Sequence, residues 1–213
     1  MIWNSIPRPW QVCLEEAWTA YCAGSLPIGA CITDAKGNIL ARGRNRIHET
    51  DGEAPYVFND TLAHAELNTL LALDTDHDTR HTSTLYTTTE PCPMCLGAFY
   101  MSGIRTLRYA AREPFAGSIN LLGTTPYLSR KPIQIFGPSD TALEILVTAL
   151  AVERDLFYRC NANNIVIQAW REVIPSGVVV GEKLHQTGTL RQMQAEGCTA
   201  ERLFESISEI ISP

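Results

Sequence analysis

The chain has 213 residues and carries 17 Lys and Arg against 23 Asp and Glu, for a formal net charge of −6. Its length indicates one domain with an extension or at most two small domains, and its content of 45% hydrophobic residues excludes wholesale disorder. The excess of acid argues against a protein that coats nucleic acid or an anionic membrane, because both need a basic face. No apolar run approaches the roughly 18 residues of a transmembrane helix, so we expect no membrane association.

Helices and strands alternate over the first three quarters of the chain. The signals are apolar residues at helical or alternating spacing, bounded by Gly, Pro and Asp. In chain order the sequence predicts a helix over 9–24, strands over 27–33 and 38–44 with a turn at 34–37, a helix from about residue 61, a polar loop around 77–81, a strand over 85–89, a helix over 92–102, strands over 104–111 and 132–136, and a helix over 140–158. Such alternation indicates a layered α/β domain.

The pattern changes beyond about residue 160. Residues 165–167 and 178–180 predict short strands, and residues 199–211 predict an amphipathic helix. This tail holds 4 Lys and Arg against 6 Glu, so it is not a basic arm for nucleic acid. We therefore expect one domain over residues 1–160 and a C-terminal extension over 161–213 that serves as a lid or as an interface element.

Two short segments carry residues suited to a metal site. His64-Ala65-Glu66 stands at the start of one predicted helix, and Cys92 and Cys95 stand at the start of the next, directly after a strand. Residues three apart share a helix face, so the two sulfurs can bind one metal ion, with His64 as a third ligand. Three protein ligands leave the fourth position of a tetrahedral zinc open to water, as in catalytic sites. The sequence predicts one zinc ion per chain.

Glu66 is the candidate catalytic residue. Helix positions two apart do not share a face, so Glu66 is expected to lean past His64 toward the metal instead of binding it, provided that the helix begins near His64. A carboxylate in that place can take a proton from water and deliver it to a ring nitrogen and then to a departing amine. The reaction would convert a ring amine into a carbonyl with release of ammonia.

A structural zinc site is the alternative from another class of function. His77 and His81 have the spacing of a zinc-finger histidine pair and, with Cys92 and Cys95, could form a closed Cys₂His₂ site. The protein would then be a binding module, and the His64-Ala65-Glu66 segment would remain unexplained.

These motifs, in this order, resemble those of the zinc-dependent cytidine and nucleobase deaminase superfamily. The resemblance covers roughly residues 8–160 and implies a three-layer α/β/α sandwich around a five-stranded mixed sheet. It assigns zinc binding to His64, Cys92 and Cys95, and proton transfer to Glu66. It also implies a homodimer, because relatives complete their active sites across subunit interfaces.

Two branches of the superfamily are similar to different segments of the chain. Residues 26–30, 43–46 and 116–118 are similar to the tRNA adenosine deaminase branch, whereas residues 93–100 are similar to the guanine deaminase branch. Both branches place an Asn such as Asn45 against the substrate ring, which implies that Asn45 binds substrate.

Further substrate contacts are expected in the loop after residue 111. Glu113 could accept hydrogen bonds from a guanine-like edge, and Phe115 is a candidate for ring stacking. Two departures from the tRNA branch bear on the substrate: the loop over 49–59 is longer, and the helix ending near Tyr158 lacks the cluster of basic and aromatic residues with which that branch reaches its tRNA.

Charge bears on the same choice. Arg42, Arg44 and Arg46 alternate and would share one strand face, where they could hold phosphates of tRNA or of a mononucleotide or could simply be solvated. The acidic balance favours a small free purine such as guanine, with the adenosine of tRNA as the alternative substrate.

The seven cysteines indicate a reducing compartment. Their number is odd, in a chain too long to need disulfide stapling, and the first 25 residues do not have the pattern of a secretory signal. We expect a cytoplasmic protein in which Cys92 and Cys95 bind metal and the remaining thiols are reduced and packed in the core, namely those of Cys13, Cys22, Cys31, Cys160 and Cys198.

Overall fold

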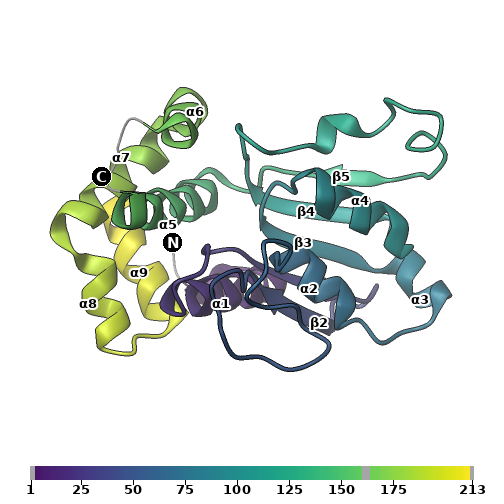
Figure 1. Ribbon diagram of the computed structural model, residues 1–213, viewed down its shortest axis with the longest axis horizontal. Coiled ribbons are helices and arrows are strands. Elements are labelled where there is room, and N and C mark those ends of the chain that lie inside the picture. Colours follow the sequence, from purple (N-terminus) through teal and green to yellow (C-terminus); the bar gives the residue numbers. More distant parts are fainter. Residues whose placement is uncertain (1–2, 160–163, 212–213) are drawn as a thin grey trace.

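The computed structural model describes residues 3–159 and 164–211 (Figure 1). Its centre is a sheet with the strand order β2-β1-β3-β4-β5, in which β1 is antiparallel to β2 and β3, and β3, β4 and β5 are parallel. The strands are β1 (Gly29–Thr33), β2 (Ile39–Arg44), β3 (Thr84–Thr89), β4 (Thr106–Ala111) and β5 (Gln134–Phe136). The expected five-stranded mixed sheet is confirmed.

Helices cover both faces of the sheet and also form the C-terminal part of the chain. They are α1 (Arg8–Cys22), α2 (Ala65–Leu71), α3 (His77–Thr82), α4 (Pro93–Ser102), α5 (Thr141–Arg159), α6 (Ile165–Val173), α7 (Pro175–Thr187), α8 (Thr189–Ala195) and α9 (Ala200–Ile211), with 3₁₀ turns at Trp3–Ser5 and Ile119–Leu121. The segment expected to be a loop around His77 is a short helix, capped by the Asp76 side chain. None of the helices in the described ranges is both long and apolar enough to cross a membrane.

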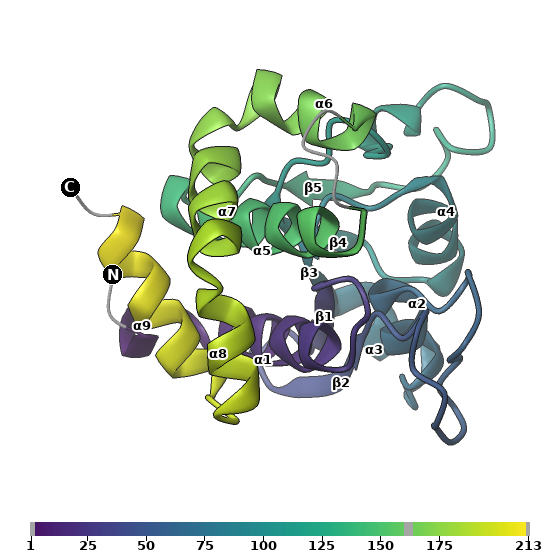
Figure 2. The ribbon, with the colours of Figure 1, turned by 60° about the vertical axis from the view of Figure 1, so that its left-hand side comes forward.

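The central strand β1 separates two apolar layers. Cys31 packs in the core cluster that includes residues of α1 and α5, whereas Ala30 and Ile32 pack in the cluster that includes residues of α2 and α4. Successive side chains of a strand point to opposite faces, so this division follows from the alternation along β1. The molecule is therefore the expected three-layer sandwich, with α1 and α5 on one face and α2 and α4 on the other (Figure 2).

The strands predicted at 165–167 and 178–180 are wrong, because both segments are helical. Asn164 caps α6 by accepting a hydrogen bond of 2.9 Å from the backbone N–H of Ile167, and Pro175 begins α7. Short runs of β-branched residues do not distinguish a strand from a buried helix by periodicity. The helix predicted over 199–211 is found as α9.

The C-terminal extension packs on the outer side of the α1–α5 layer. Leu184 of α7 and Phe204 of α9 belong to the same apolar cluster as α1 and α5. The indole N–H of Trp18 in α1 donates a hydrogen bond of 2.7 Å to the carbonyl of Cys198. The extension is thus joined to the sandwich by both apolar and polar contacts, and its helices α7 and α9 lie beside α5 and α1 (Figure 2).

The cysteines of the described residues are free thiols. Cys13 and Cys31 are buried as expected, whereas Cys22 and Cys198 are only partly buried. Cys160 lies outside the described residues.

Candidate active site

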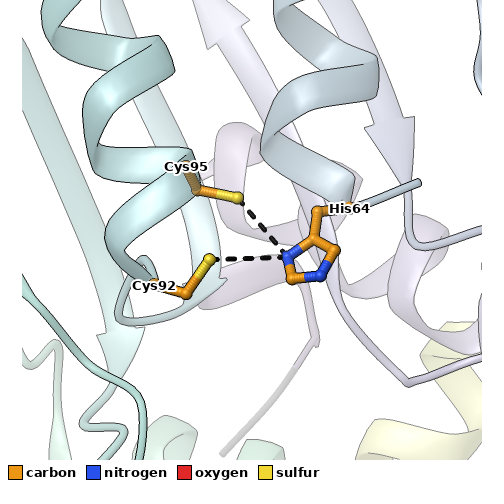
Figure 3. A group of neighbouring side chains, drawn as sticks. All are labelled: His64, Cys92 and Cys95. Atoms are coloured by element: carbon orange, nitrogen blue, oxygen red, sulfur yellow. Dashed lines mark hydrogen bonds between the residues drawn. The ribbon is translucent and has the colours of Figure 1, made fainter. Parts of the chain in front are cut away.

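The starts of α2 and α4 meet on one face of the sheet and bring three side chains together (Figure 3). His64 is the N-cap residue of α2, and Cys92 is the N-cap residue of α4. Pro93 occupies the first position of α4, where its fixed φ and missing N–H suit a helix start. This start places Cys95 in the first turn of the helix, on the same side as Cys92.

The three side chains have the spacing of a zinc site. Nδ1 of His64 lies 3.6 Å from Sγ of Cys92 and 3.5 Å from Sγ of Cys95 (Figure 3). In a tetrahedral site, Zn–N bonds of about 2.0–2.1 Å and Zn–S bonds of about 2.3 Å separate nitrogen from sulfur by about 3.6 Å. The nitrogen-to-sulfur distances among His64, Cys92 and Cys95 therefore match those of a zinc site.

The two thiols of the site differ in acidity. Hydrogen bonding with Cys95, and further hydrogen bonding with His64, lowers the pKa of Cys92 to about 4. The same interaction raises the pKa of Cys95, and burial adds to that rise. The Cys92 sulfur in turn raises the pKa of His64. An ionised sulfur beside an imidazole attracts a cation, as a metal site requires.

Glu66 lies beside the three ligands in the first turn of α2. Its side chain is buried, with the residue 4% exposed, and its two oxygens face Cys95 Sγ at 3.4 Å and Thr87 Oγ1 at 3.3 Å. Burial raises the pKa of Glu66, because a carboxylate loses hydration there. The helix begins at Ala65, which satisfies the condition on which the expected position of Glu66 depends.

A cavity of about 260 Å³ opens next to these residues. Its wall includes His64, Glu66 and Cys92, and also two of the predicted substrate contacts, Glu113 and Phe115. The remaining lining residues come from the segment before β1, the end of β3 and the residue after it, the loop after β4, and helices α5 and α6: Leu26, Pro27, Ile28, Thr89, Glu90, Ala116, Ala151, Asp155, Arg159, Val166 and Trp170.

Asn45 lies close behind this wall but does not line the cavity. Its backbone N–H donates a hydrogen bond of 2.9 Å to the carbonyl of Ile28, which does line the cavity. The Oδ1 atom of Asn45 accepts from Ile47 N–H at 3.2 Å, while the buried Nδ2 has no partner among the described residues. A buried donor without a partner is unusual in a folded protein.

The alternative Cys₂His₂ site is wrong. His77 and His81 form a separate surface group with Asp78 on α3, and this group shares no residue with the group of Cys92 and Cys95 in the described ranges. The Nε2 atom of His81 faces a guanidinium nitrogen of Arg105 at 2.9 Å instead.

Carboxylates of the same chain pair with the three alternating arginines. Arg44 makes two hydrogen bonds to Glu49, at 2.8 and 2.9 Å, and Arg46 lies 3.3 Å from the same carboxylate. Arg42 pairs with Glu16 of α1. The side chains that could have held phosphates are thus engaged within the chain.

Glu90, Val166 and Trp170 are among the cavity-lining residues that were not candidates from the sequence. Glu90 directly precedes the Pro91–Cys95 segment, and its carboxylate accepts from the N–H groups of Glu113 and Ile119, both at 3.4 Å. Its position next to the cysteines was a usable signal. Val166 and Trp170 of α6 had no such signal, because their distance in sequence from the metal ligands hides their proximity.

The fold and the three-ligand site define a zinc-dependent deaminase of the α/β/α class. Residues 6–111 match the family model of the cytidine and deoxycytidylate deaminase zinc-binding region. The chain belongs to this family, in which the deaminases are hydrolytic enzymes and zinc is the metal.

Curated relatives differ in substrate and in length. The chain is 34% identical over 111 residues to a tRNA-specific adenosine deaminase of Agrobacterium fabrum, covering 51% of this chain and 67% of the relative. It is 29% identical over 132 residues to a cytosine deaminase of Candida albicans, and the match covers 61% of this chain and 78% of that relative. It is 41% identical over 96 residues to a tRNA(Ile)-lysidine synthase of Deinococcus radiodurans, covering 44% of this chain but only 15% of that relative.

Solved structures of purine-binding relatives share the fold. A mutant of the protein NE0047 in complex with 8-azaguanine is 28% identical, with a TM-score of 0.55 over 72% of this chain and 84% of that one. A guanine deaminase from Nitrosomonas europaea is 25% identical, with a TM-score of 0.51, and the match covers 69% of this chain and 82% of that one.

Proposed function

We propose that this chain hydrolyses the ring amine of a small free heterocyclic base, with a purine such as guanine as the favoured substrate. The observation that carries the proposal is the cavity of about 260 Å³, which joins the metal ligands to Glu66 and Glu113. This volume lies just below the range of about 300–1,000 Å³ that holds drug-sized ligands. A single base is the nucleic-acid component that suits such a space.

His64, Cys92 and Cys95 would hold the zinc ion, which when bound acts as a Lewis acid and lowers the pKa of water. Glu66 then has two tasks in the proposed reaction: its carboxylate removes a proton from the attacking water, and it delivers protons to a ring nitrogen and to the departing amine. A C–O bond forms, the C–N bond breaks, and ammonia leaves. Burial favours the protonated form of Glu66 that the second task needs.

Glu113, Phe115 and Asn45 are the proposed substrate contacts. One oxygen of Glu113 accepts from the N–H groups of Phe115 and Ala116 at 3.0 and 3.3 Å, which holds the carboxylate in place, and its other oxygen could accept from N–H groups of a guanine-like edge. The Phe115 ring, more than half exposed, offers a stacking surface at the cavity. The buried Nδ2 of Asn45 is a donor that substrate could satisfy after a small movement.

Deamination of adenosine in tRNA is the second candidate, because the Agrobacterium relative bears that name. A tRNA ligand is held largely through its phosphates and needs cationic side chains. The pairing of Arg42, Arg44 and Arg46 with carboxylates of the chain favours the small substrate instead.

A homodimer in the cytoplasm completes the proposal. The dimer is supported by exposed apolar side chains on and beside α4, among them Met101 and Tyr127. The cytoplasmic location is supported by the free thiols of the described cysteines, since such thiols persist in a reducing compartment.

An ammonia-release screen tests the proposed function. The zinc-loaded chain is incubated with guanine, adenine, cytosine, their ribonucleosides and tRNA, with Glu66→Gln as the control for contaminating activity. We expect release from at least one free base and none from tRNA. Release from tRNA alone would establish the second candidate, and release from none of these substrates would contradict both.

A further inference from the structure

Helix α6 of the C-terminal extension forms one wall of the cavity. Val166 and Trp170 line the same space as His64 and Glu66, although about a hundred positions of sequence separate the two pairs. The opening of the cavity is therefore shaped by a part of the chain that lies beyond the sheet and its zinc helices.

The α6 wall is held in place by an apolar cluster between α5, α6 and α7. Trp170, which is 7% exposed, packs there with Ile167 of α6, Leu156 of α5 and Val178 of α7. Close-packed interiors resist displacement, because a shift of one side chain costs contacts with all of its neighbours. Trp170 thus belongs both to a rigid core and to the cavity wall.

A hydrogen-bond chain anchors the start of the same helix. Asp155 of α5 accepts a hydrogen bond of 2.7 Å from Nδ2 of Asn164, and the Oδ1 atom of Asn164 caps Ile167 N–H at 2.9 Å. The Asp155 carboxylate also pairs with Arg159 Nε at 2.9 Å, and Asp155 and Arg159 both line the cavity. The first turn of α6 is thereby fixed to α5 at the cavity rim.

We infer that Val166 and Trp170 set the size limit of the site: they admit a free heterocyclic base and exclude the same base attached to ribose. The inference rests on the proposed function, since it names what distinguishes substrates of the same site. A ribosyl group needs additional volume beside the ring, and a wall packed on its far side cannot yield that volume without strain. Val166 and Trp170 are therefore specificity-determining residues supplied by the extension.

Substitution of Trp170 tests the inference. For the zinc-loaded chain and its variants, kcat/KM is measured for the base that the wild type deaminates and for its ribonucleoside, and binding of both is measured by calorimetry. In Trp170→Ala we expect the nucleoside-to-base ratio of kcat/KM to rise by about tenfold or more, as is typical of a changed apolar pocket. Nucleoside binding should strengthen relative to base binding, and Trp170→Phe should give a smaller change.

Two further variants keep the test decisive. Ile165→Ala changes an exposed residue of the same helix that does not line the cavity, and it should leave the ratio unchanged. Val166→Ala removes less buried volume than Trp170→Ala and is therefore the variant to use if Trp170→Ala does not fold. In Val166→Ala we also expect the nucleoside-to-base ratio of kcat/KM to rise.

The outcomes separate the two proposals. Deamination of a free base by the wild type, with an unchanged ratio in folded Trp170→Ala and Val166→Ala, would overturn the size limit and leave the proposed function standing. Equal wild-type kcat/KM for base and nucleoside would also overturn it. A wild type that neither binds nor deaminates any free base would overturn the proposed function, and the size limit with it.

Discussion

The side chains that carry the chemistry are few and close together. His64 and Cys92 are N-cap residues of two helices, and Glu66 sits in the first turn of one of them. Backbone N–H groups at a helix start favour negative charge, so the two helix starts favour the ionised sulfur at the metal site. The first turn of α2 thus holds Glu66 next to the metal ligand His64, and the start of α4 supplies the ligands Cys92 and Cys95.

Replacement of Glu66 by Gln should remove turnover and leave the metal in place. The amide keeps the shape of the side chain but cannot carry a proton between water and substrate, so we expect kcat to fall by about 10²–10⁴-fold or more. Ammonia release and zinc content measure the two effects. Near-normal turnover would contradict the proposed role of Glu66, and loss of zinc would show that Glu66 is a ligand.

Zinc content should depend on His64 and not on the histidines of α3. Elemental analysis should find about one zinc per wild-type chain, little in His64→Ala, and an unchanged amount in the matched double variant His77→Ala/His81→Ala. Wild-type protein without zinc, whose cysteines all titrate as thiols, would disprove the metal site. Zinc loss confined to the double variant would restore the structural site on α3.

At the scale of elements, helix α7 lies against α5 where glycine permits a close approach. A Cβ at Gly181 would lie 2.7 Å from Cβ of Val152 and 2.8 Å from the carbonyl oxygen of Ala149. The position of α7, and with it the apolar cluster between α5, α6 and α7, therefore depends on the absence of a side chain at Gly181.

A matched pair of glycine substitutions tests this packing. Gly181→Ala should destabilise the fold by about 1–3 kcal/mol, because the backbone of α5 cannot move out of the way cheaply. Gly97→Ala in α4 meets no heavy atom within 4 Å and should be neutral or stabilising by up to about 1 kcal/mol, because Ala favours helix. Urea unfolding of both variants gives the comparison. Equal stabilities would show that α7 can separate from α5 at little cost.

At the scale of the whole molecule, the net charge and the ion pairs of the arginines suit a small uncharged ligand. The net charge is −6, and the arginine side chains on and after β2 form ion pairs with Glu15, Glu16 and Glu49. A polyanion would find no row of unpaired cations on this face. Binding of an uncharged base, in contrast, does not depend on the charge of the face.

Activity should accordingly vary little with salt. For a free base we expect kcat/KM to change less than about threefold between 50 and 200 mM salt, because no counterions are released on binding, whereas a ligand held by several phosphates loses affinity steeply over the same range. Steady-state rates at four salt concentrations, with tRNA binding measured in parallel, provide the test. A steep decline with salt would indicate a polyanionic substrate.

Much of this protein could be read from local patterns. The alternation of helices and strands predicted the layered sheet, and His64, Cys92 and Cys95 were identifiable because ligand spacing on helix starts is a local property. The start of α2 at Ala65 also places Glu66 as local helix geometry requires. Local signals failed at 165–167 and 178–180, where runs of β-branched residues suit a strand and a buried helix equally.

Only the tertiary structure decided which residues line the cavity. Val166 and Trp170 line the cavity beside the metal ligands because α6 is anchored to α5 through Asp155 and Asn164, and no local spacing encodes proximity over so long a separation. Likewise, three alternating arginines are a basic stripe in the sequence, whereas in the folded chain each of them forms an ion pair with Glu16 or Glu49. The residues of the metal site follow from local chemistry, whereas the ligand that can reach it depends on which distant segments pack around it.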